Sequence, residues 1–408
     1  MANIVWLTDV SSEDVGIVGY KGSKLCSLYQ NGFFIPQCFV VTIQAFQYFL
    51  EHRGLNNEII RILRQTLDDK ESLLNAEDSI QDLILKSELP DAVRDDINYA
   101  YEHMDMNTDI FKMLNKNALN FIKAGRNLPY TAIRPSFNKE RLKGKYFINI
   151  KGREALINSI KQTWASFFNV QNLSILKNDG IDSIGIAVII QKMINSEKYA
   201  VVNVNQNELN INCVYGLGET FSIAVPDSYL INANSLEVIN KVVNKQESMF
   251  IRDDNYGRTL RKGVNLSLID KEKLTSDEIR KISNFSLSVF QHYNKNVSVE
   301  LALENGKFYL IDVKEPSESQ PEIFVQEPQN ESAGQNIFSM FNENPVNYGN
   351  AENETSNLQN YEQNIAENRA SMSSKVPISF DIKITDQTNI EELKAKLKAI
   401  KEFINKEL

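Results

Sequence analysis

Residues Val297 to Lys314 read V-S-V-E-L-A-L-E-N-G-K-F-Y-L-I-D-V-K. Two runs of alternating apolar and polar residues flank Glu304-Asn305-Gly306, a pattern typical of a β-hairpin. In the first run the odd-numbered residues are apolar and share one face of the predicted strand, opposite Ser298, Glu300 and Ala302. The sequence therefore predicts two antiparallel strands, each with one face against the core.

The length of the hairpin loop decides which side chains share a face. A two-residue Asn-Gly loop would turn Asp312 and Lys314 towards the valines, and burying an unpaired carboxylate costs several kcal/mol. A three-residue loop with Gly306 in the left-handed conformation pairs apolar residues with apolar ones and puts Glu300, Asp312 and Lys314 together. We therefore expect the three-residue loop. The charged face is either an ordinary solvated surface or a site for a metal-bound phosphate.

The composition restricts the class of protein. The 408 residues can form a substantial core in one large or two medium domains. A net charge of −9 argues against binding to nucleic acid or to an anionic membrane, because either needs a basic patch. The three widely spaced cysteines, Cys26, Cys38 and Cys213, fit neither a disulfide framework nor a zinc site. With no signal-peptide pattern and no apolar run long enough for a membrane span, we expect a cytoplasmic protein.

The chain divides into three regions. Residues 1–316 alternate strand and helix patterns, including an amphipathic helix from Ser276 to Tyr293, and we expect one domain of the α/β (α+β) class. Residues 317–376 are rich in Asn, Gln, Glu and Ser and are predicted to be disordered, because they cannot bury enough apolar surface to offset the entropy of ordering. Residues 377–408 are predicted to form a strand and an amphipathic helix. This helix can self-associate, dock on a partner or pack on its own strand.

A glycine-rich stretch precedes the first helical pattern. Residues 16–25 read G-I-V-G-Y-K-G-S-K-L. Such a turn can present backbone N–H groups to an anion, with Lys21 and Lys24 adding positive charge. The alternative is a capped helix with solvated lysines. The spacing G-x-x-x-x-G-K-[ST] is absent, so the stretch is not a P-loop.

Eight short motifs follow one another along residues 1–316. They are G-Y-K-G-S-K-L at 19–25, G-F-F-I-P-Q-C-F-V-V-T at 32–42, A-I-R at 132–134, Q-K-M at 191–193, Y-G-L-G-E at 215–219, P-D at 226–227, V-E-L-A at 299–302 and Y-L-I-D-V-K at 309–314. In this order they resemble G-G-K-x-A-x-L, G-x-x-V-P-x-G-F-x-x-T, A-V-R-S-S, V-Q-x-M, W-G-L-G-E, T-P-D, I-E-W-A and Y-L-L-Q-A-R. These motifs characterise the N-terminal ATP-binding (PEP/pyruvate-binding) domain of the phosphoenolpyruvate synthase and pyruvate phosphate dikinase family. The shared order makes the resemblance specific.

The resemblance implies a two-lobed, ATP-grasp-like nucleotide-binding domain, with lobes at roughly 1–195 and 196–316 and ATP between them. It also implies roles for individual residues. By this resemblance, Lys21 and Arg134 would hold phosphates, and Gln191 and the hinge residues Met193 and Ile194 would face the adenine. Glu300 and Asp312 would bind Mg²⁺. Lys314 would replace a phosphate-binding arginine. These groups suit phosphoryl transfer, which depends mostly on positioning and charge neutralisation.

The sequence departs from the family pattern near these residues. Pro135 stands where the first serine after Arg134 is expected, and the loop that follows is shorter than in the family. Lys314 is a point charge in place of a guanidinium fork, which weakens bidentate phosphate binding. Asp312 replaces a glutamine, and a carboxylate is at least as good a magnesium ligand. These departures bear on catalysis more than on fold.

The family's enzymes relay phosphate through a histidine, and this chain offers no equivalent. His52, His103 and His292 all lack the T-x-H setting of the relay, so we predict no catalytic residue and do not expect the complete dikinase reaction from this chain alone. We expect Mg²⁺–ATP binding for phosphoryl transfer to a separate phosphohistidine, pyruvate-domain or substrate component. The alternative is a catalytically degenerate family member that acts as a nucleotide-sensing or protein-interaction module.

Overall fold

The structure is a computed structural model. It describes residues 2–66, 69–104, 128–139, 142–179, 185–254 and 257–314. The chain divides into two compact units, Met1–Asn330 and Glu331–Leu408, and the second lies wholly outside the described residues. The predicted disordered segment 317–376 and the predicted strand and helix of 377–408 lie outside them too.

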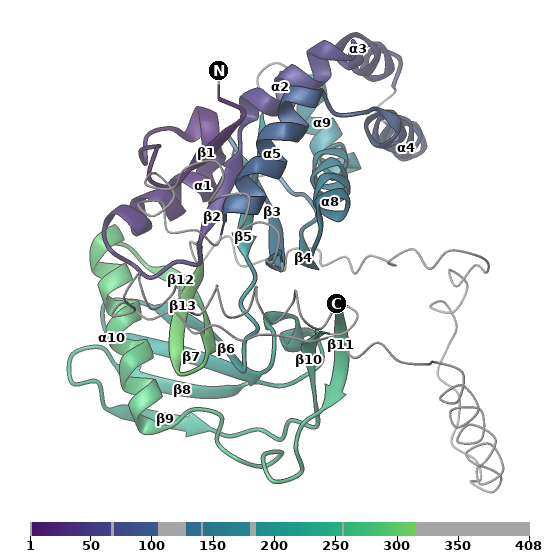
Figure 1. Ribbon diagram of the computed structural model, residues 1–408. Helices are drawn as coiled ribbons and strands as arrows, with labels where there is room; N and C mark the ends of the chain where they lie inside the picture. Colours follow the sequence, from purple (N-terminus) through teal and green to yellow (C-terminus); the bar gives the residue numbers. More distant parts are fainter. Residues whose placement is uncertain are drawn as a thin grey trace, which may run out of the picture. The chain divides into compact units, whose positions relative to one another are not determined.

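The first sheet has five antiparallel strands in the order β1-β2-β5-β3-β4 (Figure 1). Their bounds are Ile4–Trp6 for β1, Cys38–Val41 for β2, Thr131–Phe137 for β3, Phe147–Ile150 for β4 and Ile186–Lys192 for β5. The central strand β5 is buried along nearly its whole length, which explains its unbroken apolar run.

Six helices and one face of this sheet share a hydrophobic cluster. The helices are α2 (Ile43–His52), α3 (Leu55–Gln65), α4 (Lys70–Lys86), α5 (Asp91–His103), α8 (Arg153–Ser166) and α9 (Val170–Asp179). The fully buried Trp164 stacks on Phe49 with 5.3 Å between ring centroids. Such aromatic pairs stabilise a core beyond their buried area.

The second sheet has six antiparallel strands in the order β13-β12-β6-β7-β8-β9. The bounds are Lys198–Val204 for β6, Glu208–Tyr215 for β7, Asp227–Asn232 for β8, Val238–Val242 for β9, Val297–Glu304 for β12 and Lys307–Lys314 for β13. A short 3₁₀ helix, η2 (Gly218–Ser222), follows β7, and β10 (Ser248–Asp253) pairs only with β11 (Arg258–Gly263) among the described strands.

Helix α10 (Ser276–Tyr293) has the bounds that the sequence predicts (Figure 1). Thr275 and Glu278 form a capping box at its start, and Asn294 ends it in the left-handed conformation. In the described chain no helix is both long and apolar enough to cross a membrane.

Helix α1 (Val15–Gln30) joins the two sheets through a second hydrophobic cluster. This cluster holds Leu25 of α1, Val40 and Ile189 from the other face of the first sheet, and Val202 and Leu301 from the second sheet. The expected mixed α/β class is confirmed. Both sheets are antiparallel, and helices cover their apolar faces.

The β12–β13 hairpin corrects the predicted loop. Glu304 pairs with Lys307, so the loop consists of only Asn305 and Gly306, with φ of 51° and 73°. Positive φ at both positions is the geometry of a type I′ turn, whose twist matches that of the flanking strands. The predicted three-residue loop is wrong, because Asn-Gly forms the tighter turn.

The extra residue that the apolar pattern requires lies in the strand instead of the loop. Leu301 pairs with Leu310 and Glu300 pairs with Asp312, which leaves Ile311 as a β-bulge. Beyond the bulge Val299 pairs with Val313 inside the core. Glu300 and Asp312 are therefore cross-strand neighbours.

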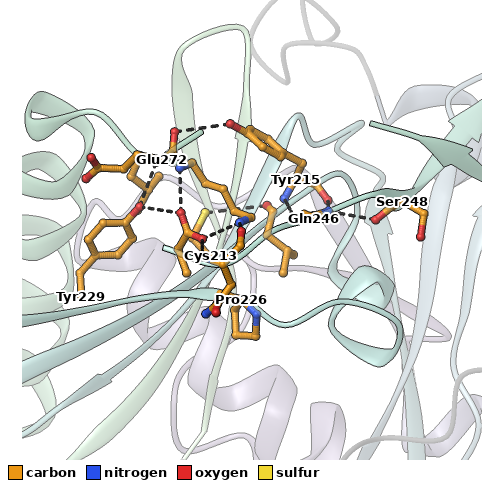
Figure 2. A network of polar contacts seen from close by, with 12 residues as sticks. Cys213, Tyr215, Pro226, Tyr229, Gln246, Ser248 and Glu272 are labelled. Atoms are coloured by element: carbon orange, nitrogen blue, oxygen red, sulfur yellow. Dashed lines mark hydrogen bonds and ion pairs between the residues drawn. The ribbon is translucent and has the colours of Figure 1, made fainter. Parts of the chain in front are cut away.

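A buried polar network fixes the chain that leads from β9 to α10 (Figure 2). Asp227 and Lys273 form an ion pair in which neither side chain is exposed, and the Lys273 ammonium also donates to the Asn244 carbonyl. The Gln246 side chain accepts from the backbone N–H of Tyr215 and donates to its carbonyl, both at 3.0 Å. The network thus holds the end of β7, where η2 begins.

Candidate functional site

A cavity of about 620 Å³ lies between the two sheets. Its lining comes from β3, β4, β5 and the segment after β5 on one side, and from β6, η2, β12 and β13 on the other. Along β3 the lining changes from Arg134 to Ala132, and along β12 it changes from Glu300 to Ala302. The cavity therefore has a charged end at Arg134 and Glu300 and a more apolar end at Ala132 and Ala302, where Lys192 is the charged residue in the lining.

Arg134 crosses from the first sheet to the second at the charged end. Its Nη2 lies 2.5 Å from Oδ2 of Asp312, and its Nη1 donates to the Ile311 carbonyl at 2.8 Å. Nζ of Lys21 lies 3.5 Å from the same Asp312 oxygen. Burial alone would raise the pKa of Asp312, but the Arg134 and Lys21 cations hold it well below its usual range. Asp312 is therefore an ionised, buried acceptor.

Glu300 belongs to a separate set of contacts on the same strands. Its Oε1 accepts from Nζ of Lys314 at 2.8 Å, and its Oε2 accepts from the Tyr199 hydroxyl at 2.7 Å. Burial and the adjacent Glu300 carboxylate raise the pKa of Tyr199, so its hydroxyl remains a neutral donor. Glu300, Lys314 and Tyr199 all line the cavity.

Lys21 owes its position to a break in helix α1. Gly19 has φ of 70° and ψ of 172°, which interrupts the helix. In an unbroken helix the Gly22 N–H would donate to the Val18 carbonyl. Instead the Ser136 hydroxyl lies between them, accepting from Gly22 N–H at 2.9 Å and donating to the Val18 carbonyl at 2.6 Å. The glycine-rich stretch is thus an interrupted helix that turns Lys21 towards Asp312.

The predicted hinge residues lie towards the apolar end. Gln191, Met193 and Ile194 all line the cavity, and the Met193 N–H donates to the Tyr130 carbonyl at 2.8 Å. Gln191 is 2% exposed, and its buried Nε2 has no hydrogen-bond acceptor among the residues that the structure describes. An unsatisfied buried donor costs about 1–3 kcal/mol. Nε2 is therefore available to a ligand in the cavity.

Six of the eight predicted ATP-binding residues line the cavity, while Lys21 and Asp312 lie behind its charged end. The sequence reasoning missed Glu219, Tyr199 and Tyr146 as lining residues. The Tyr146 hydroxyl donates to Oε1 of Glu219 at 3.3 Å, and burial is the main cause of the raised pKa of Glu219. Glu219 ends the motif Y-G-L-G-E, a signal that could have identified it.

The fold and the cavity define the class of the protein. It is a mixed α/β domain with a cavity, charged at one end, between two antiparallel sheets. The chain belongs to the family described as pyruvate phosphate dikinase, AMP/ATP-binding domain, whose model matches residues 15–334.

Curated relatives of the chain include two phosphoenolpyruvate synthases. A probable phosphoenolpyruvate synthase from Methanocaldococcus jannaschii is 30% identical, covering 77% of this chain and 26% of that protein. The phosphoenolpyruvate synthase of Pyrococcus furiosus is 26% identical, covering 76% of this chain and 43% of that protein. The chain thus spans less than half the length of either relative.

Among solved structures, the chain is similar to the D-alanine–D-alanine ligase of Bacillus anthracis. The identity is 10% and the TM-score 0.27, and the match covers 75% of this chain and 58% of that chain.

Proposed function

We propose that the cavity binds Mg²⁺–ATP and that the domain supplies phosphate to a separate phosphohistidine or substrate component. The observation that carries this proposal is the change along the cavity from the apolar side chains of Met193 and Ile194 to the charged group of Arg134, Glu300 and Lys314. A nucleotide has the matching polarity, with a flat, largely apolar base at one end and charged phosphates at the other. The volume of about 620 Å³ is in the range of small-molecule sites. Family membership supports the assignment.

The cations at the charged end are assigned to the phosphates. Arg134 and Lys314 line the cavity. Lys21 does not line it, but it contacts the same Asp312 oxygen as Arg134. Catalysis of phosphoryl transfer rests on fixed positive charges that neutralise the phosphate oxygens. Because these side chains are held by α1, β3 and β13, they are placed before a ligand binds.

Glu300 is the residue that fits a magnesium ion. Its carboxylate lines the cavity, and both of its oxygens face donors at the charged end, Tyr199 and Lys314. The described residues contain no group of three or more His, Cys, Asp or Glu side chains that could hold a metal ion. Mg²⁺ usually takes one or two protein carboxylates together with phosphates and waters, so Glu300 suffices. Bound there, the ion would neutralise charge on the phosphate oxygens.

The base of the nucleotide is assigned to the apolar end. Gln191 offers its buried Nε2 donor, and Met193 and Ile194 offer apolar surface. A purine ring presents acceptor nitrogens within a flat apolar body, which matches this pairing of one donor with apolar walls.

The phosphate acceptor is assigned to another component. His103 contacts the Tyr99 carbonyl and His292 contacts the Ser27 hydroxyl. Neither these two nor His52 lines the cavity. We place the reaction in the cytoplasm, where the buried free thiols of Cys26, Cys38 and Cys213 remain reduced.

The proposal is tested by thermal denaturation and calorimetric titration of the full chain with ATP, with and without Mg²⁺. We expect ATP to raise stability by about 2.7 kcal/mol at a hundredfold excess over Kd, and Mg²⁺ to tighten binding. Glu300→Gln should remove the magnesium effect. Glu154→Gln, which changes an exposed glutamate of α8, is the matched control and should keep it.

Absence of binding at millimolar ATP would refute the proposed function. Binding without transfer of labelled phosphate to a histidine-bearing acceptor would favour the nucleotide-sensing module over a transferase. Transfer that depends on Arg134 and Glu300 would support the transferase.

A further inference from the structure

The carboxylate of Asp312 has a different environment from that of Glu300, although the two residues are cross-strand neighbours. We propose that Asp312 is a positioning residue that holds Arg134 and Lys21 for the phosphates, and that it does not ligate the metal. This inference rests on the proposed function. Of the two carboxylates, it assigns magnesium binding to Glu300 only.

Both carboxylates are hydrogen-bonded by the protein, Glu300 through Tyr199 and Lys314. What separates Asp312 from Glu300 is therefore burial and access to the cavity. Oδ2 of Asp312 contacts Arg134 and Lys21, and Oδ1 accepts from the backbone N–H of Val313 at 2.9 Å. The residue is 1% exposed and is not among those that line the cavity. Mg²⁺ gives up its waters reluctantly and needs open coordination positions beside its ligand. Glu300, with its side chain 18% exposed and on the cavity wall, meets this requirement.

The β-bulge at Ile311 provides a second acceptor for Arg134, beside the Asp312 carboxylate. Arg134 donates through Nη1 to the Ile311 carbonyl and through Nη2 to Asp312, so the guanidinium fork is held at two points. Two-point contacts fix the orientation of the planar group as well as its distance. A regular ladder would pair Glu300 with Ile311 and turn Asp312 towards the core beside Val299. The extra residue in the strand therefore places the Ile311 carbonyl and the Asp312 carboxylate side by side as the two acceptors of Arg134.

Asp312 also allows two cations to share one small region. Lys21 Nζ and Arg134 Nη2 approach the same carboxylate oxygen, at 3.5 Å and 2.5 Å. Like charges at such separation repel strongly in a buried site, and a shared anion offsets this repulsion. Removing the charge of Asp312 should therefore loosen both Lys21 and Arg134, whether or not a metal is present.

The test compares ATP binding to the full chain in EDTA and in excess Mg²⁺ by calorimetry. The ratio of the two dissociation constants measures the coupling between metal and nucleotide. For Asp312→Asn we expect about tenfold weaker binding in both solutions and an unchanged ratio. For Glu300→Gln we expect a ratio close to one, and binding in EDTA changes only through Lys314, which loses its carboxylate partner. Weaker binding of Asp312→Asn only in magnesium would make Asp312 a metal ligand and overturn the proposal.

Two further measurements separate the possible failures. If Asp312→Asn does not fold, Lys21→Met removes one of the cations that Asp312 holds. Equal weakening in both solutions then supports the proposal, and unchanged affinity in EDTA overturns it. If the wild-type chain does not bind ATP, the proposed function fails, and tripolyphosphate replaces ATP as a probe of the charged end. No effect of Asp312→Asn on tripolyphosphate binding, or no binding to the wild type, would then reject the positioning role.

Discussion

Ser136 acts at the scale of a single residue by filling the gap that Gly19 opens in helix α1. Its hydroxyl takes the place of the missing bond between Gly22 and Val18, so both backbone groups stay satisfied although they are buried. A side chain inserted in this way is a recognised cause of helix kinks. The kink in turn directs Lys21 to Asp312.

Gly19→Ala should destabilise the protein by about 2 kcal/mol or more. The added Cβ would lie 2.5 Å from the backbone carbon and oxygen of Ser136, which cannot move aside easily, and φ of 70° is itself strained for alanine. Gly16→Ala, with no heavy atom within 4 Å of its added Cβ, is the matched control. Urea denaturation followed by tryptophan fluorescence measures both. Equal stabilities of the two variants would contradict the assigned role of Gly19.

At the scale of the element, helix α10 shows how local signals and one distant contact combine. The Thr275–Glu278 capping box is readable in the sequence. The same Glu278 carboxylate also receives Nζ of Lys198, at 2.8 Å from both oxygens. Burial works to raise the pKa of Glu278, but the hydrogen bonds from Lys198 and the Thr275 backbone outweigh it and lower this pKa. The contact ties α10 to β6.

Glu278→Gln should lower the free energy of unfolding by about 1 kcal/mol at pH 7. Glutamine still completes a capping box, so the variant isolates the ion pair. Because the folded pKa is depressed, the carboxylate stabilises the protein above its unfolded pKa of about 4.3. That contribution is lost as pH falls through the folded pKa, so the difference between variant and wild type should shrink below about pH 4.

Chemical denaturation between pH 7 and pH 3 measures this difference. Asp277→Asn, in the same turn of α10 and 69% exposed, serves as the control and should change stability by less than about 0.5 kcal/mol. A gap between Glu278→Gln and wild type that stays constant down to pH 3 would show that the charge of Glu278 does not produce it.

At the scale of the whole molecule, the pair of Asp227 and Lys273 joins segments far apart in sequence. Asp227 accepts from the backbone N–H groups of Asn244 and Lys273, at 2.8 Å and 2.9 Å, and from the Tyr229 hydroxyl at 3.1 Å. Through the neighbouring Gln246, the same region is hydrogen-bonded to Tyr215, the first residue of the motif Y-G-L-G-E whose later residues line the cavity (Figure 2). The arrangement of η2 at the cavity thus depends on a buried network.

Lys273→Met should destabilise the protein by about 3–5 kcal/mol, because it leaves Asp227 as an uncompensated buried charge. The double variant Asp227→Asn with Lys273→Met removes both charges and should recover part of the loss. Urea denaturation of the two variants and the wild type checks the order of stability. A double variant less stable than Lys273→Met alone would contradict this explanation.

The sequence by itself determined the local elements and the family. The amphipathic pattern predicted helix 276–293 with its observed ends, because apolar periodicity acts between neighbours along the chain. The order of short motifs indicated the pyruvate phosphate dikinase family, which the family match over residues 15–334 confirms. The apolar pattern also required one extra residue in the hairpin, although it gave that residue the wrong place.

Only the tertiary structure decided where charges from remote segments meet. Arg134 and Asp312 are 178 residues apart, and their contact depends on the bulge at Ile311, whose position in the strand the sequence did not reveal. The ion pair between Asp227 and Lys273 likewise depends on how β8 and the segment before α10 pack. Buried charges are stable only when a partner lies within a few ångströms, and that distance is set by strand register and packing between remote segments. The hairpin pattern did bring Glu300, Asp312 and Lys314 to one face, because these residues are close in sequence. The partners that remote segments supply, such as Arg134 for Asp312, could not be assigned from the sequence.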